Sequence, residues 1–179
     1  VRAAARLRDA GVSFTMQMAG DGPLGPMLRE MIVQYGLEAQ VRLLGSLSPD
    51  QVRREMEHSA IFLFTSDHHE GWGAVLNEAM NSGCAVIASH AAGSTPYLVH
   101  HGVNGCVYPF GDENALYGNL VRLLEHPSER IGMGQAAYET IIGTWNAQVA
   151  ADRLCALLRA ILAEDSSPEL YLEGPCSRA

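Results

Sequence analysis

The stretch Glu70-Gly71-Trp72-Gly73-Ala74-Val75-Leu76-Asn77-Glu78 decides how this chain is interpreted. An apolar run at residues 60–64 precedes it, and a second apolar run, residues 85–88, follows it after Gly83. Short apolar runs around a glycine-rich turn and a helix are typical of two buried strands joined by a crossover helix. The start of such a helix presents unpaired N–H groups and a partial positive charge, which favour a pyrophosphate. The stretch therefore indicates a site for a sugar nucleotide.

Two carboxylates, Glu70 and Glu78, stand at the ends of this stretch. If the helix starts near Gly73, Glu78 lies just over one turn inside it, and Glu70 stays in the preceding loop. One carboxylate can then accept hydrogen bonds from a ribose diol, while the other faces the group beyond the phosphates. The spacing alone leaves open the alternative that Glu78 is a solvent-facing helix residue and Glu70 an ordinary loop acid.

Composition restricts the class of protein. The chain has 179 residues, 47% of them hydrophobic, which is typical of a globular α/β domain with a core. A formal net charge of −8 argues against a nucleic-acid partner for this segment. All 12 basic residues are arginine, so the chain has neither a Schiff-base lysine nor a phosphate-loop lysine.

Cysteine usage and the lack of long apolar runs predict a cytoplasmic protein. The cysteines form no Cys-x-x-Cys pair, and we expect reduced, mostly buried thiols. No apolar run is long enough to span a bilayer, and no signal peptide is visible. The chain starts at Val1 inside a helical pattern, so we expect a piece of a longer protein. The cysteines are Cys84, Cys106, Cys155 and Cys176.

Strand-like and helix-like segments alternate along the chain, which predicts an α/β fold with a doubly wound, Rossmann-like parallel sheet. Extra helices follow at the C-terminal end. The expected strands are residues 13–19, 41–44, 60–64, 85–88 and 105–108. The expected helices are residues 1–10, 24–35, 49–58, 74–82, 95–101, 113–125, 128–141 and 146–163. Residues 164–179 have the composition of a flexible tail.

Small or polar turns follow the first four predicted strands. Gly20, Gly45, Ser66 and Gly93 lie in these turns. Because parallel strands end at one edge of a sheet, we expect the turns to line one ligand crevice.

Three segments resemble the C-terminal domain of family 4-type retaining glycosyltransferases, which have the GT-B fold. They are Met18-Ala19-Gly20-Asp21-Gly22-Pro23, then Val41-Arg42-Leu43-Leu44-Gly45, then residues 66–83. The hallmark is two glutamates separated by seven residues, matched here by Glu70 and Glu78. The resemblance covers about residues 1–163, which we therefore expect to form a nucleotide-sugar-binding domain.

The resemblance implies roles for individual residues. Glu70 is the implied catalytic residue beside the donor sugar, and Glu78 is implied to hold the ribose hydroxyls. The remaining implied donor-binding residues are Gly71, Trp72, Gly73, Gly20, Gly45 and Ser66. The implied donor is a nucleoside-diphosphate sugar, such as a UDP- or GDP-sugar, and no cofactor or metal is expected. His68-His69-Glu70 contains metal-ligating residue types, but no further ligand set accompanies it.

The sequence departs from the family pattern at two places. Trp72 replaces a phenylalanine, and Tyr97 stands where many relatives carry a glutamate. The family's diphosphate-binding arginine and lysine, and its acceptor domain, would precede Val1. We therefore expect this chain alone to be inactive.

The longer protein would take a glycan or lipid-linked acceptor through that acceptor domain, with peripheral association at the inner face of the membrane. A sugar-nucleotide epimerase and a non-catalytic nucleotide-binding module on the same fold stay open as alternatives.

Overall fold

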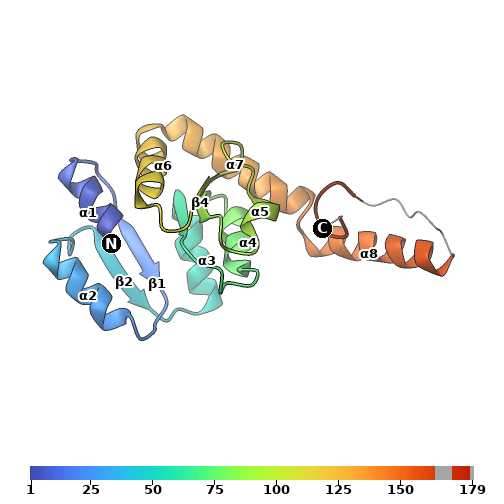
Figure 1. Ribbon diagram of the computed structural model, residues 1–179, viewed down its shortest axis with the longest axis horizontal. Coiled ribbons are helices and arrows are strands. Elements are labelled where there is room, and N and C mark those ends of the chain that lie inside the picture. The colour runs from blue at the N-terminus through green and yellow to red at the C-terminus, as the bar shows by residue number, and fades with distance from the viewer. Residues whose placement is uncertain (164–170, 178–179) are drawn as a thin grey trace.

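The computed structural model describes residues 1–163 and 171–177, and these residues form eight helices and five strands (Figure 1). In chain order the elements are α1 (Arg2–Asp9), β1 (Met16–Ala19), α2 (Gly25–Gln34), β2 (Val41–Gly45), α3 (Pro49–Glu57), β3 (Ile61–Phe64), α4 (Ala74–Asn81), β4 (Ala85–Ser89), α5 (Thr95–Leu98), β5 (Gly105–Tyr108), α6 (Glu113–Glu125), α7 (Pro127–Gly143) and α8 (Ala147–Leu162).

The strands pair in parallel, as predicted, but they form two sheets instead of one. β1 pairs with β2, and β4 lies between β3 and β5 in the larger sheet. The expectation of a single continuous sheet is therefore wrong for the described residues, where no ladder joins β1 to β3. Side-chain packing joins the two sheets instead, because α1 contributes to both cores. Ala4 and Ala5 belong to the core over β1 and β2, whereas Leu7 packs with the larger sheet.

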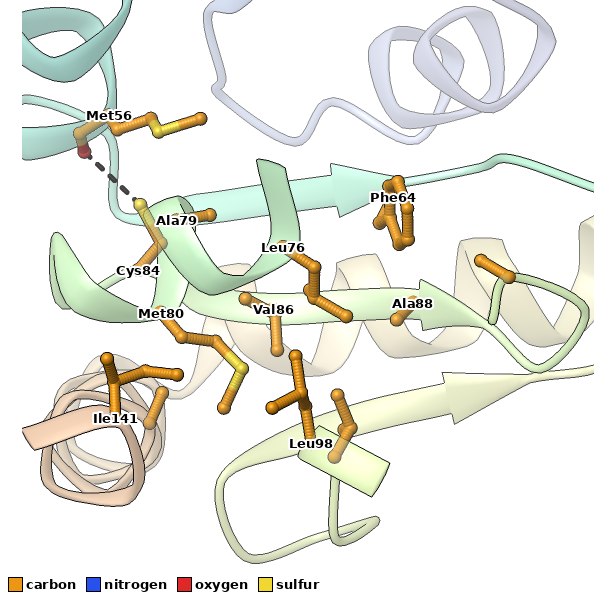
Figure 2. Close-up of a cluster of buried hydrophobic side chains, with 13 residues drawn as sticks. Met56, Phe64, Leu76, Ala79, Met80, Cys84, Val86, Ala88, Leu98 and Ile141 are labelled. Carbon is orange, nitrogen blue, oxygen red and sulfur yellow. Dashed lines mark hydrogen bonds between the residues drawn. The ribbon is translucent and has the colours of Figure 1, made fainter. Parts of the chain in front are cut away.

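The larger sheet is covered on both faces, which confirms the doubly wound arrangement. All five residues of β4 are buried, and the first four alternate between two cores. Val86 and Ala88 face a core shared with α3, α4, α5 and α7, shown in Figure 2. Ala85 and Ile87 face a second core, to which α6 and α7 contribute. This alternation is what a strand buried on both sides requires.

Local signals set most element ends where the sequence predicts them. At the start of α3 the Ser48 side chain accepts from the Gln51 N–H, and the Gln51 side chain accepts from the Ser48 N–H. This capping box, followed by proline, confirms the predicted helix start. β1 begins at Met16 instead of the predicted residue 13, since its ladder with β2 starts at the Met16–Val41 pair. Residues 13–15 thus lack a strand partner.

All four cysteines are free thiols, but only Cys84 and Cys106 are buried, so the prediction of mostly buried thiols holds for half of them. The Cys84 thiol donates to the Met56 carbonyl at 3.2 Å, a bond that Figure 2 shows beside the core. Burial raises the pKa of the Cys84 thiol to about 11, so this thiol stays protonated at neutral pH. Cys155, in contrast, is exposed on α8.

Helix α8 points away from the sheets, and none of its residues is buried (Figure 1). Residues 171–177 return to it: the Arg153 guanidinium stacks over the Tyr171 ring at 3.9 Å and donates to the Pro175 carbonyl at 3.2 Å. Residues 164–170 and 178–179 lie outside the described residues, so the flexible tail stays a prediction. Within the described residues, no helix is both long and apolar enough to cross a membrane.

Two glycines of α7 provide a matched test of how this helix packs against the turn before β4. A Cβ on Gly134 would lie 2.3 Å from the Gly83 carbonyl oxygen in the turn before β4, whereas a Cβ on Gly132 meets nothing within 4 Å. We expect Gly134→Ala to lower the free energy of unfolding by about 1–3 kcal/mol through overpacking. Gly132→Ala should raise it by about 0.5–1 kcal/mol, because alanine favours a helix interior. Urea unfolding measures both changes, and equal effects of the two substitutions would contradict this packing.

Candidate functional site: the loop that carries Glu70

The loop between β3 and α4 has a backbone shape that depends on glycine. Gly73 caps α4 in the left-handed conformation, with φ 80° and ψ 61°. A Cβ at Gly73 would lie 2.3 Å from the Phe64 ring at the end of β3. Both the φ angle and the contact therefore require glycine at this position. The predicted helix start is confirmed, and Glu78 lies in the second turn of α4.

A second turn, which follows β4, holds this loop by backbone hydrogen bonds. The Gly93 N–H donates to the Glu70 carbonyl at 3.3 Å, and the Ser94 N–H donates to the Trp72 carbonyl at 2.9 Å. The two chain segments lie so close that a Cβ on Gly93 would sit 1.6 Å from the Gly71 carbonyl oxygen. The sequence showed Gly93 as a turn residue but gave no sign of this contact.

A cavity of about 400 Å³ opens beside Glu70, at the edge where β3, β4 and β5 end. It is a shallow depression that is widely open to solvent. The lining residues are Thr65, Ser66, Asp67, His69, Glu70 and Phe110. The structure thus brings two of the predicted site residues, Ser66 and Glu70, to one cavity. Sequence reasoning missed Phe110, although its place just after a predicted strand end was a usable signal.

The other predicted site residues lie around this cavity or apart from it. Gly71, Trp72 and Gly73 belong to the same loop as Glu70, and Glu78 is exposed on α4. Gly20 and Gly45 follow the smaller sheet, where the Gly20 N–H donates to the Gly45 carbonyl at 2.8 Å. These two glycines are not among the residues that line the cavity.

The adjacent histidines turn to different partners. The His69 backbone N–H donates to Asp67 Oδ1 at 2.9 Å, and His69 Nδ1 lies 3.1 Å from the same oxygen. These contacts lower the pKa of the Asp67 carboxyl, with the backbone hydrogen bond as the largest cause. His68 packs against the rings of His90 and Phe110. Within the part of the chain that the structure describes, no three metal-ligating side chains gather.

Three aromatic rings form contacts between the β3–α4 loop and the start of α8. The ring centroids of Trp72, Tyr97 and Trp145 are 5.6 to 6.5 Å apart in all three pairs. Because the three distances are similar, the rings lie at the corners of a triangle. Trp72 is therefore not stacked between the rings of Tyr97 and Trp145. The Trp72 indole N–H also donates to the Asn77 side chain at 2.9 Å, which fixes the ring on α4. Tyr97 therefore takes part in this cluster.

Residues 1–140 match the sequence model of a protein family described as glycosyl transferases group 1. The chain belongs to this family. The amylovoran biosynthesis glycosyltransferase AmsK of Erwinia amylovora is 29% identical over 160 residues, which cover 87% of this chain and 39% of that protein. The putative colanic acid biosynthesis glycosyltransferase WcaL of Escherichia coli is 29% identical over 167 residues. These residues cover 90% of this chain and 41% of that protein. The chain thus spans about two fifths of the length of these relatives.

Solved structures confirm the predicted fold class, that of GT-B glycosyltransferases. Anabaena HepE in complex with UDP superposes with a TM-score of 0.76 at 23% identity, covering 89% of this chain and 44% of that one. The C-terminal domain of LpcC, a group 1 glycosyl transferase from Francisella tularensis, gives a TM-score of 0.72 at 24% identity. That match covers 82% of this chain and 77% of the LpcC domain.

The backbone contact at Gly93 is testable in this chain, because its only two tryptophans, Trp72 and Trp145, lie in the aromatic cluster. Gly93→Ala must push the Glu70–Gly73 loop away and should cost about 1–3 kcal/mol of stability. We expect a changed tryptophan emission spectrum together with a lower urea midpoint.

Gly71→Ala is the matched control, since a Cβ there meets nothing within 4 Å. It should leave the emission of the free protein unchanged. An unchanged spectrum in Gly93→Ala would contradict the close approach of the two turns.

Proposed function

We propose that this chain binds the sugar-nucleotide donor of a retaining glycosyltransferase, with its site at the Glu70–Glu78 segment. One observation carries the proposal: a loop held in place by Gly93 and Ser94 brings Glu70 to a cavity and ends at the start of α4, which carries Glu78. Family membership and the UDP complex of the structurally similar HepE support it.

The proposed binding mode follows from charge. The start of α4 and the N–H groups of Gly71, Trp72 and Gly73 favour the diphosphate. Glu78, exposed in the second turn of α4, accepts hydrogen bonds from the ribose hydroxyls. Glu70 faces the cavity, where it lies beside the donor sugar and its reacting carbon.

In the reaction the bond between the anomeric carbon and the diphosphate breaks, and its electron pair leaves with the diphosphate. The oxygen of the acceptor hydroxyl attacks the anomeric carbon from the same side, and its proton passes to the leaving diphosphate, so the configuration at carbon is retained. N–H groups of the loop stabilise the negative charge that develops on the leaving diphosphate. We assign the acceptor site and further cationic groups to the remainder of the longer protein.

Nucleotide titration tests the donor site directly. We expect one of UDP, GDP or ADP to bind this chain saturably in calorimetry. Glu78→Gln should raise its Kd by about 10-fold or more, since a hydrogen bond to a charged group contributes about 1.5–3 kcal/mol. Glu125→Gln, an exposed glutamate at the far end of α6, is the matched control and should leave the Kd unchanged. Equal effects of the two substitutions would exclude Glu78 from the site.

Retention and metal independence need the longer protein. We expect NMR of the product to show the anomeric configuration of the donor, and EDTA to leave the rate unchanged. An inverted product or a rate abolished by EDTA would contradict this mechanism.

We further propose that the longer protein acts in polysaccharide biosynthesis, as the names of AmsK and WcaL say of those relatives. It would work in the cytoplasm, at the inner face of the membrane, on a glycan or lipid-linked acceptor. Recovery of the full-length protein outside the cytoplasm in cell fractionation would contradict this location.

A further inference from the structure

The cavity beside Glu70 combines two kinds of surface. Hydroxyl groups of Thr65 and Ser66 and the carboxylates of Asp67 and Glu70 are hydrogen-bonding groups. Phe110, which follows β5, adds an aromatic residue that is 47% exposed. A half-exposed phenylalanine inside a polar cavity has no role in the binding mode proposed above.

Contacts from two neighbouring strand ends hold Phe110 in place. Its backbone N–H donates to His90 Nδ1 at 2.8 Å. The His68 ring meets the Phe110 ring edge-on, with centroids 6.3 Å apart and an angle of 62°. His68 also meets His90 edge-on at 5.9 Å. The three rings come from the loops after β3, β4 and β5, so the sheet itself sets the position of Phe110.

The charges in the cavity exclude some ligand groups. Asp67 and Glu70 both line it, and the lowered pKa of Asp67 keeps that carboxyl ionised at neutral pH. Two carboxylates repel phosphate groups, which therefore belong at the other end of the loop, near α4. Carboxylates accept hydrogen bonds from hydroxyl groups, and an aromatic face packs against C–H groups.

A pyranose ring has both of these features, since hydroxyl groups surround an apolar C–H face. We propose that Phe110 is the stacking platform of a pyranose subsite, in which Asp67 and Glu70 accept hydrogen bonds from the sugar hydroxyls. This inference rests on the proposed function. The ring has two possible sources, the donor sugar and the terminal sugar of the acceptor, and both share this chemistry.

The donor arm of the test compares UDP with UDP-glucose, and GDP with GDP-mannose, by calorimetry. Phe110→Ala should leave the Kd of the free nucleotide within about twofold and weaken the matching sugar nucleotide by about 3- to 10-fold, the usual value of an aromatic contact. Phe110→Tyr keeps the ring and should restore wild-type affinity. Tyr138→Ala removes another exposed aromatic, on α7, and should change neither Kd.

The acceptor arm follows the Phe110 ring signals by NMR during titration with methyl α-glucoside or methyl α-mannoside. Shifts that Phe110→Ala weakens, together with an unchanged sugar-nucleotide Kd, assign the subsite to the acceptor sugar. An equal loss of nucleotide and sugar-nucleotide affinity would overturn the inference, because Phe110 would then contact the nucleotide. No effect in either arm would also overturn it.

The two proposals fail in different ways. If the folded wild-type chain binds no nucleotide, the donor proposal fails, and the glycoside titration still decides whether Phe110 contacts a sugar.

Discussion

The position of the Glu70–Gly73 loop depends on the absence of a side chain at Gly93. Without a Cβ, the turn after β4 comes close enough for the Gly93 and Ser94 N–H groups to reach the carbonyls of Glu70 and Trp72. These two bonds place Glu70 at the cavity and Trp72 in its aromatic cluster. A loop held in this way needs little ordering when a ligand binds, which favours affinity.

The close approach of these turns in turn depends on the larger sheet. β3 and β4 are neighbours in parallel register, so the loops that follow them leave the same edge side by side. β4 keeps this register because it is buried on both faces, with Val86 in one core and Ile87 in the other. Burying each such side chain contributes about 1.5–3 kcal/mol. The site is therefore built on the best-packed strand of the described residues.

The sequence predicted the features that depend on local patterns. Apolar runs located the strands, and the Ser48-Pro49 pair located the start of α3. The glycine before Ala74 located the start of α4, and two of the predicted site residues, Ser66 and Glu70, line one cavity.

Features that depend on contacts between distant segments were not predictable. The division into two sheets depends on which distant strands pair, and no local pattern encodes that. A Cβ on Gly93 would lie 1.6 Å from the Gly71 carbonyl oxygen, and this close contact between two loops has no local sequence signal. Trp145 and Phe110 lie 73 and 40 residues beyond Trp72 and Glu70 in the sequence, so only the fold brings them together.

The most direct test of the donor-site proposal is an amide NMR map of this chain during titration with UDP and GDP. We predict that the largest shifts fall on the N–H groups of Gly71, Trp72 and Gly73, and on the first turn of α4. Shifts that gather instead on α8, or on the far end of α6, would contradict a donor site at the Glu70–Glu78 segment.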